Sequence, residues 1–248
     1  MNRLRLAVLL TALVAVHKSI GAQATAAQAA DSIGASIDRA YLSGDSARIQ
    51  LVRAQAERLA TSFPNSGLLQ HYLGFALYRE ATASHGGPKS LSLLTRAKET
   101  LGKSLATHPL PETHALLASI DGQLIAADPS RGMELGMASQ ASMTAASSLD
   151  ATNPRVWLLK GEGAMFTPPE YGGGPTTARE QLTHAIELFG KDAPKPGEPS
   201  WGRAEAHLWL GQAYEQLHER TLAIAEYRKA VEIAPNYSWA QTLAAAPK

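Results

Sequence analysis

AEAHLWLGQAY at residues 204–214 and TLAIAEYRKAVEIAP at residues 221–235 decide the fold. The two segments place small and large residues on one helical face at spacings of three, four and seven residues: Leu210, Gly211, Tyr214, Ala223, Tyr227 and Ala230. Pro235 ends the second helix because proline lacks the amide hydrogen that would continue it. The segments therefore predict a helix–turn–helix unit in which a small residue lets a large one from the partner helix come close.

This unit resembles a tetratricopeptide repeat. Counted from Ala204 as position one, the six residues named above and Pro235 fall at seven of the eight signature positions, and His207 stands where tryptophan is usual. The resemblance covers 34 of the 248 residues. It implies an all-α fold of stacked helix-turn-helix repeats, a right-handed superhelix (an α-solenoid) whose concave groove is lined by the first helix of each unit.

Weaker copies of the unit lie upstream, so about five hairpins are expected, at residues 30–62, 67–109, 112–150, 154–189 and 204–237. The signature residues of the upstream copies are Leu73, Gly74, Ala97, Trp157, Gly161 and Ala178. The loop between the two helices is expected to be expanded in 67–109 and in 154–189. Residues 190–202 are rich in Pro and Gly and predict a linker, which we interpret as a plain spacer, with a hinge as the alternative. Residues 238–246 predict a capping helix.

Residues 1–24 have the features of a secretory signal peptide. Arg3 and Arg5 precede an uncharged, mostly apolar run at 6–16, and Ala22-Gln23-Ala24 offers a small-x-small cleavage pattern. The run is shorter than the ~20 apolar residues that span a bilayer, although an uncleaved anchor is the alternative. We therefore expect residues 25–248 to be the helical repeat domain of an exported bacterial protein, periplasmic or secreted, without a membrane span.

Composition and motifs argue against catalysis. The chain has no Cys, which excludes disulfides and thiolate ligands, and a formal charge of +1, which offers no basic footprint for nucleic acid. The eight histidines are scattered, and no Gly-x-Ser-x-Gly elbow occurs. We expect no enzyme activity, catalytic residue, metal or cofactor. A cluster of His114, Asp121 and a further carboxylate would support the enzyme alternative.

Tyr171-Gly172-Gly173-Gly174-Pro175 is the most distinctive stretch. Glycines before a helix can bind an anion through backbone N–H groups. However, no strand precedes the stretch and no Gly-Lys-Ser/Thr follows it, which argues against a P-loop. We expect a structural turn, with positive φ at glycine and a helix that starts at Pro175 and is capped by Thr176 or Thr177. The residues expected to pack this loop against the first helix are Phe166, Pro168, Pro169 and Tyr171.

The resemblance also implies which side chains face the groove, since positions 2, 5, 9, 12 and 13 of the first helix usually do so in this family. On this sequence the candidate groove residues are His71, Phe75, Tyr78, Arg79, Arg155, Glu162, Phe166, Glu205, Gln212 and Glu215. The groove would have an aromatic, basic end and an acidic end, which suits an extended peptide. The expected function is a scaffold that binds a protein or peptide, although the aromatic residues could equally pack under the long loops.

A small-ligand carrier or transport-associated helper is the alternative, with a pocket closed by the expanded Gly-rich loops. A deep apolar pocket floored by Phe166 and Tyr171 would favour the carrier, whereas an open, shallow groove would favour peptide binding. The identity of the partner and the oligomeric state stay open.

Overall fold

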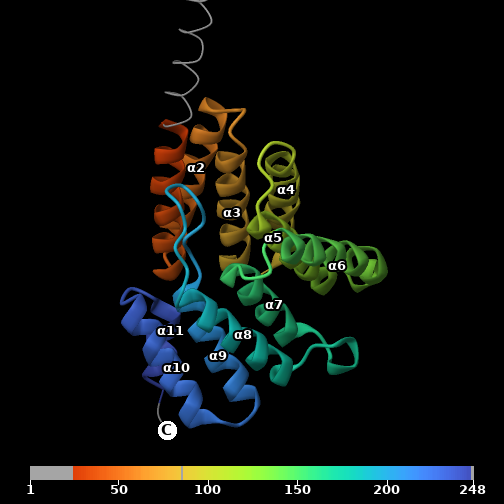
Figure 1. The fold of residues 1–248 in the computed structure, drawn as a ribbon, viewed down its shortest axis with the longest axis vertical. Helices are drawn as coiled ribbons and strands as arrows, with labels where there is room; N and C mark the ends of the chain where they lie inside the picture. The colour runs from red at the N-terminus through yellow and green to blue at the C-terminus, as the bar shows by residue number, and fades with distance from the viewer. Residues whose placement is uncertain (1–24, 85, 247–248) are drawn as a thin grey trace, which may run out of the picture.

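A computed structural model describes residues 25–84 and 86–246, and every regular element in that part of the chain is helical (Figure 1). The helices run in consecutive pairs: residues 25–42 with α2 (Ser46–Ser62), α3 (Gly67–Ala83) with α4 (Gly87–Leu105), α5 (Pro111–Ala127) with α6 (Gly132–Leu149), α7 (Pro154–Phe166) with α8 (Pro175–Phe189), and α9 (Arg203–Gln216) with α10 (Arg220–Ile233). Helix α11 (Ser238–Ala244) follows the last pair. The expected all-α architecture of stacked hairpins is confirmed. The expected signal peptide at 1–24 lies outside the described residues.

Local sequence signals set where these helices begin. The Ser66 hydroxyl accepts a hydrogen bond from the Leu69 amide at the start of α3, and the Asn153 side chain accepts from Arg155 and Val156 at the start of α7. Prolines stand in the first turn of α4, α5, α7 and α8, where the missing amide hydrogen has no helical partner to lose. Caps and prolines together therefore fix the units' boundaries.

The same contact joins the two helices in three of the units. A glycine on the first helix lies against a large side chain on the second: Gly74 on Leu101, Gly161 on Leu182 and Gly211 on Tyr227. A Cβ at Gly74 or Gly161 would lie 2.5 Å from the leucine Cγ or Cδ2, far inside van der Waals contact. These positions need glycine because of the partner side chain.

Most of the other signature residues are buried between helices. Ala97, Ala178, Ala223 and Ala230 have no exposed surface, and Leu73 and Leu210 are also buried. Trp157 and Tyr214 are half-buried and Pro235 is exposed. Small residues thus allow close packing of neighbouring helices, as the repeat pattern predicts.

The second hairpin differs from its expected form. Only residues 84–86 separate α3 from α4, so the extra residues in 67–109 lengthen the two helices and do not form an expanded loop. Arg79, Glu80 and Ala81 favour helix and carry α3 on to Ala83. Between α7 and α8, by contrast, the loop is expanded and contains a 3₁₀ turn, η2 (Pro169–Tyr171).

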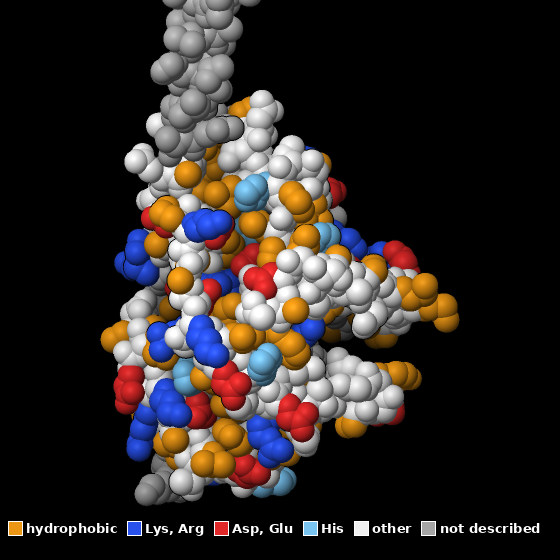
Figure 2. All heavy atoms as spheres, viewed as in Figure 1, with side chains coloured by type: hydrophobic (Ala, Val, Ile, Leu, Met, Phe, Trp, Pro, Cys, Tyr) orange, Lys and Arg blue, Asp and Glu red, His pale blue; other side chains and the backbone are white. Residues whose placement is uncertain are grey.

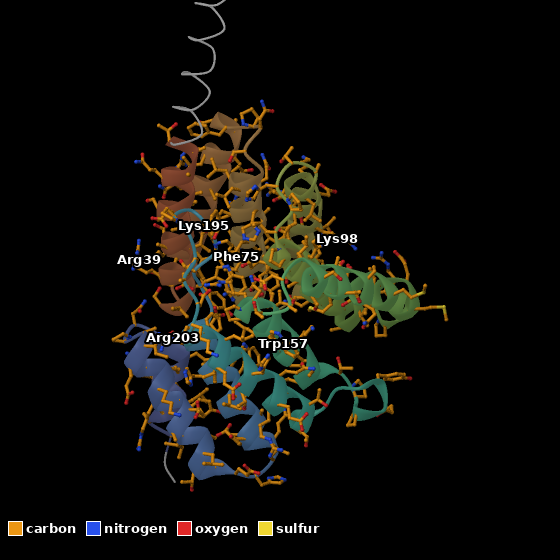
Figure 3. The ribbon with its side chains drawn as sticks, viewed as in Figure 1. Arg39, Phe75, Lys98, Trp157, Lys195 and Arg203 are labelled. Carbon is orange, nitrogen blue, oxygen red and sulfur yellow. The ribbon has the colours of Figure 1, made fainter. Side chains whose placement is uncertain are left out.

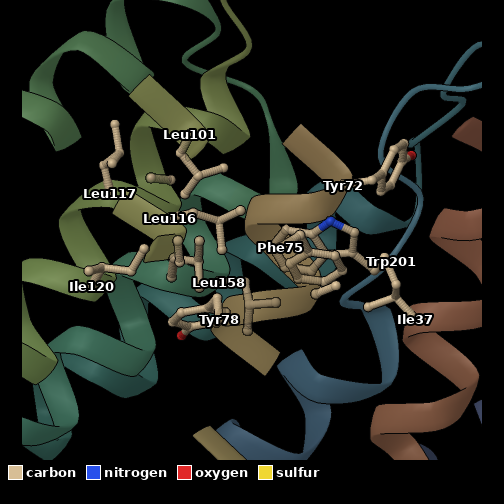
Figure 4. Packing of buried hydrophobic residues seen from close by; sticks show 14 of the residues in the cluster. Ile37, Tyr72, Phe75, Tyr78, Leu101, Leu116, Leu117, Ile120, Leu158 and Trp201 are labelled. Atoms are coloured by element: carbon tan, nitrogen blue, oxygen red, sulfur yellow. The ribbon is translucent and has the colours of Figure 1, made fainter. Parts of the chain in front are cut away.

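Residues 190–202 cross the concave side of the molecule. The Tyr72 hydroxyl donates to the Gly197 carbonyl at 3.0 Å, and the Trp201 ring stacks on Phe75 with centroids 4.8 Å apart (Figure 4). The Arg155 guanidinium holds the Asp192 carboxylate at 2.6 Å. The segment is therefore a packed strap, and its reading as a plain spacer is wrong.

The two ends of the stack meet. The Ser238 hydroxyl, at the start of α11, donates to the Leu42 carbonyl at 3.4 Å, and the Asn236 amide donates to the Arg39 carbonyl at 3.4 Å. Leu42 belongs to the same apolar cluster as Tyr237. In Figure 1 the helix of residues 25–42 accordingly runs down to the C-terminal helices. The concave side is thus enclosed by both ends of the chain.

Two arms project from this compact body. Helix α6 packs on α5 but contacts α7 little, and the η2 loop extends beside it, leaving a notch between the two arms in Figure 2. Met133 and Met137 on α6 and Tyr171 in the loop are exposed. In Figure 3, Phe75 lies in the middle of the body and Arg39 lies at its edge. Within the described residues, no helix is both long and apolar enough to cross a membrane.

Candidate functional site on the concave face

Six of the ten candidate groove residues lie inside the protein. Their exposed fractions do not exceed 3%: His71, Phe75, Tyr78, Arg79, Arg155 and Glu205. The expectation that they line an open groove is wrong, because the strap of residues 190–202 covers α3 and α7 on that side. Of the others, Glu162, Gln212 and Glu215 are half-buried and Phe166 is 73% exposed.

A buried ion pair lies at the centre of the face. The Arg79 guanidinium donates to the Glu205 carboxylate and lies over the rings of Tyr41, at 4.0 Å, and Trp201, at 5.3 Å. Burying a charged group costs free energy because the group loses its hydration. The attraction between the Arg79 and Glu205 charges offsets this cost. The pair joins α3 to α9 across the chain.

Two further carboxyl groups face this pair without a partner of their own. Asp38 comes from the helix of residues 25–42 and Glu162 from α7; neither makes a hydrogen bond or ion pair within the described residues. Burial raises the pKa of Asp38 and of Glu162 to about 7, the neighbouring Glu205 charge adds to the rise, and Arg79 opposes it. Both side chains remain half-buried. At neutral pH each carboxyl group is therefore divided between its charged and neutral forms.

Other polar atoms in this centre also lack a protein partner. Six buried side-chain atoms among the described residues have none, and four of them lie near this centre: Asp38 Oδ1, Arg79 Nε, Arg155 Nε and Trp201 Nε1. Buried polar atoms normally form hydrogen bonds. The centre of the face therefore has unused capacity to bind a polar group.

An aromatic row borders this centre on the C-terminal side. The rings of Phe166 and Trp209 meet edge to face with centroids 5.8 Å apart, and those of Trp209 and Trp239 meet at 5.5 Å. Phe166 is 73% and Trp239 39% exposed, while Trp209 is half-buried. Three rings from α7, α9 and α11 thus present partly open surfaces suited to another flat or cationic group.

Tyrosines complete the polar centre. Burial raises the pKa of Tyr41, Tyr78 and Tyr237 above the ordinary range, helped by the Glu162 and Glu205 charges. These hydroxyls stay protonated at physiological pH, so they can donate as well as accept hydrogen bonds.

A separate cavity of about 580 Å³ lies where the strap passes the N-terminal ends of α5 and α7. Two contacts join parts of its lining: Arg155 pairs with Asp192, and the Asn153 amide donates to the Glu112 carboxylate at 2.8 Å. Burial raises the pKa of Glu112. Because these contacts attach the strap to the helices, we assign the cavity a structural role.

The Tyr171–Pro175 loop forms a turn away from the site. Gly172 and Gly174 have φ of 83° and 90°, and Pro175 begins α8. Neither Thr176 nor Thr177 caps α8, whose N-cap is Gly174. The expected packing of the loop is wrong, since Pro168, Pro169 and Tyr171 are exposed along with Phe166. Neither Phe166, Tyr171 nor the Gly-rich loop lines the cavity of about 580 Å³ beside the strap.

The residues considered for a catalytic or metal site, Asp121 and His207, make contacts between helices. The Asp121 carboxylate is buried and held by Lys98 at 2.5 Å, so it does not combine with His114. His207 contacts Glu226 at 2.6 Å between α9 and α10. No group of three His, Asp or Glu among the described residues could hold a metal ion.

Sequence reasoning missed several residues of the site. Asp38 and Tyr41 lie on a hairpin that has no signature residues. Trp201 lies in the segment interpreted as a spacer. Trp209 and Trp239 lie outside the usual groove positions of the repeat. One usable signal was available: Trp209 is one turn beyond Glu205, so both lie on one face of α9.

Comparisons with known proteins agree with this architecture. The fold and site define a class, the all-helical repeat proteins that enclose a concave face. Residues 204–237, which are 34 of the 248 residues, match the family model of the tetratricopeptide repeat, and this is the segment where the repeat resemblance is strongest. A search of curated proteins gives no match.

The chain is also similar to a solved structure, the HusA haemophore from Porphyromonas gingivalis. The TM-score is 0.59 at 17% sequence identity, over 73% of this chain and 93% of the other. At this identity the likeness concerns the fold.

Proposed function

We propose that this protein is a non-catalytic carrier that holds a small ligand on the C-terminal half of its concave face. The observation that carries the proposal is the juxtaposition of unpaired buried polar atoms with a partly open aromatic row. Small-ligand sites combine apolar and aromatic walls with a few fixed polar groups. This half of the face has both.

The resemblance to a haemophore supports carriage as a use of this fold. The groups on the face here do not favour haem itself. Haem has two carboxylates that need cations, whereas Arg79 is already paired with Glu205 and the unpaired groups, Asp38 and Glu162, are carboxyls.

Peptide binding is the second candidate, and the strap favours it. An extended segment of the chain lies on α3 and α7, with Trp201 against Phe75 and Asp192 on Arg155. The face can therefore hold an extended polypeptide. A partner peptide would have to displace the strap first, which ranks this function below carriage.

Export belongs to the same proposal. The basic start, short apolar run and Ala22-Gln23-Ala24 pattern support delivery to the periplasm or the medium. A carrier is useful there because it can take up a ligand outside the cytoplasm and deliver it.

Native mass spectrometry of the exported protein tests carriage. Wild-type protein is expected to retain a small molecule that is lost from the double variant Phe166→Ala/Trp209→Ala. A matched variant, Met133→Ala/Met137→Ala on the exposed face of α6, should keep it. Co-purification of a polypeptide in place of a small molecule would favour the second candidate, and an unliganded protein that shows no thermal shift with a metabolite library would rule carriage out.

A further inference from the structure

Glu162 on α7 and Glu205 on α9 lie close enough for their charges to interact, but they differ in their partners. Glu205, on α9, holds the Arg79 guanidinium and is buried. Glu162, on α7, forms no ion pair or hydrogen bond within the described residues, feels the Arg79 charge only at longer range, and is half-buried. The face therefore contains one carboxylate with an ion-pair partner, that of Glu205. Near it lies a second carboxyl group, that of Glu162, which is partly exposed and forms no ion pair within the described residues.

An aromatic ring follows each of these carboxyls by one helical turn. Phe166 is four residues after Glu162, and Trp209 is four residues after Glu205, so each ring lies on the same helical stripe as its carboxyl. The rings of Phe166 and Trp209 touch edge to face at 5.8 Å. An acidic pair and an aromatic pair thus lie side by side across α7 and α9.

We propose that this arrangement recognises an organic cation, an ammonium or guanidinium group, bound by the Glu162 carboxylate with the faces of Phe166 and Trp209 against it. A carboxylate supplies a charge-assisted hydrogen bond, and aromatic faces attract cations through their quadrupole. The inference rests on the proposed carrier function and names its ligand class.

The other groups of the face agree with a cation. The buried Asp38 Oδ1 has no partner in the described part of the chain and adds acidic character, which would repel an anion. The tyrosines Tyr41 and Tyr237 supply further oxygens near the same charges. The carboxylates do not group as metal ligands within the described residues, so the face suits an organic cation larger than a metal ion.

Isothermal titration calorimetry with three matched probes tests the inference. Phenethylamine, 2-phenylethanol and 3-phenylpropionate all carry a phenyl ring on a short alkyl chain, and they end in an ammonium, a hydroxyl and a carboxylate. We expect the amine to bind at least tenfold more tightly than the alcohol, and the carboxylate more weakly still. Glu162→Gln should lose about tenfold in amine affinity and leave the alcohol unchanged.

Glu180→Gln is the matched control, since Glu180 is exposed on α8 and the change in charge is the same. Circular dichroism melting checks that Glu162→Gln remains folded. Equal binding of the three probes, lost in Trp209→Ala but not in Glu162→Gln, would overturn the cation and leave carriage standing. Absence of binding by all three probes would count against both.

A basic side chain of a peptide carries the same chemistry as a free amine. The peptides acetyl-Ala-Phe-Lys-Ala-amide and its norleucine counterpart separate the two sources. Tighter binding of the lysine peptide than of phenethylamine assigns the cation to a polypeptide, and weaker binding assigns it to a small molecule. Equal affinity of the lysine and norleucine peptides would contradict cation recognition in a peptide.

Discussion

The two halves of the concave face use aromatic residues in opposite ways. On the N-terminal side, Trp201 of the strap stacks on Phe75 of α3, and both are buried. On the C-terminal side, Phe166, Trp209 and Trp239 make ring contacts with one another while keeping exposed surface. The first set stabilises the fold, and the second is available to a ligand. The contrast shows that facing the groove in a repeat pattern does not by itself make a residue available for binding.

The largest effect should come from breaking the central ion pair. Arg79→Ala leaves the Glu205 carboxylate buried and unpaired and should cost about 3–5 kcal/mol of unfolding free energy. Urea unfolding followed by circular dichroism measures it. The double variant Arg79→Met/Glu205→Leu should recover most of the loss, and a loss below about 1 kcal/mol for Arg79→Ala would contradict the burial of the pair.

The next largest loss of unfolding free energy is expected for substitution of Trp201, and Trp209 is the residue to compare it with. Trp201→Ala removes a buried ring and should cost about 3 kcal/mol, whereas Trp209→Ala removes a half-buried one and should cost about 1 kcal/mol. Ligand binding should respond in the reverse order. Equal destabilisation by the two variants would remove the distinction between a closed and an open half.

The acidic centre predicts an unusual dependence of stability on pH. The pKa of Glu162 is about 7 in the folded protein, above its ordinary value of 4.5, because burial and the Glu205 charge outweigh Arg79. The charged form is thus disfavoured by folding, and this cost is complete above pH 7 and disappears below about 4.5. Wild-type protein should therefore melt at a higher temperature at pH 5.5 than at pH 8.

Glu162→Gln isolates this contribution. At pH 8 the variant should be more stable than wild type by about 1–2 kcal/mol, since the buried charge is gone. Its gain on acidification should be about half that of wild type, because Asp38 behaves in the same way. Melting curves of Glu162→Gln and wild type at pH 8 and pH 5.5 measure both differences in stability. A destabilised Glu162→Gln at pH 8 would mean that the carboxylate has a partner in the folded protein.

The smallest effect on stability should follow removal of Phe166. Its side chain is 73% exposed, so Phe166→Ala should change the unfolding free energy by no more than about 0.5 kcal/mol. Tyr171→Ala, in an equally exposed place, is the control. Phenethylamine affinity should fall for Phe166→Ala alone, and equal effects of the two substitutions would argue against a special role of the aromatic row.

The repeat architecture could be predicted from sequence because its signals are local. Gly211 and Tyr227 are 16 residues apart, and their contact follows from helical periodicity and a short turn. Gly161 with Leu182 and Gly74 with Leu101 follow in the same way. Such pairs need no knowledge of how distant units are arranged.

The site depends on contacts that the repeat pattern does not encode. Arg79 meets Glu205 across 126 residues, and Tyr72 meets Gly197 across 125. Whether Phe75 faces water or protein is decided by the strap, and no periodic signal in residues 190–202 indicates that this segment folds back onto α3. The repeat pattern predicts groove positions for an open solenoid. In this protein the strap and the neighbouring helices bury most of those side chains, so they stabilise the fold.

The meeting of Leu42 with Ser238 limits how this protein can grow. Repeat proteins usually fold and evolve by nearest-neighbour contacts, so that units can be added or removed. Here a contact between residues 196 positions apart closes the stack, and an inserted or deleted hairpin would pull the two ends out of register. The contact between the first and the last helices therefore requires a fixed number of hairpins between them. Because that contact forms only after the last hairpin is synthesised, folding should be more cooperative and slower than in an open array of the same length.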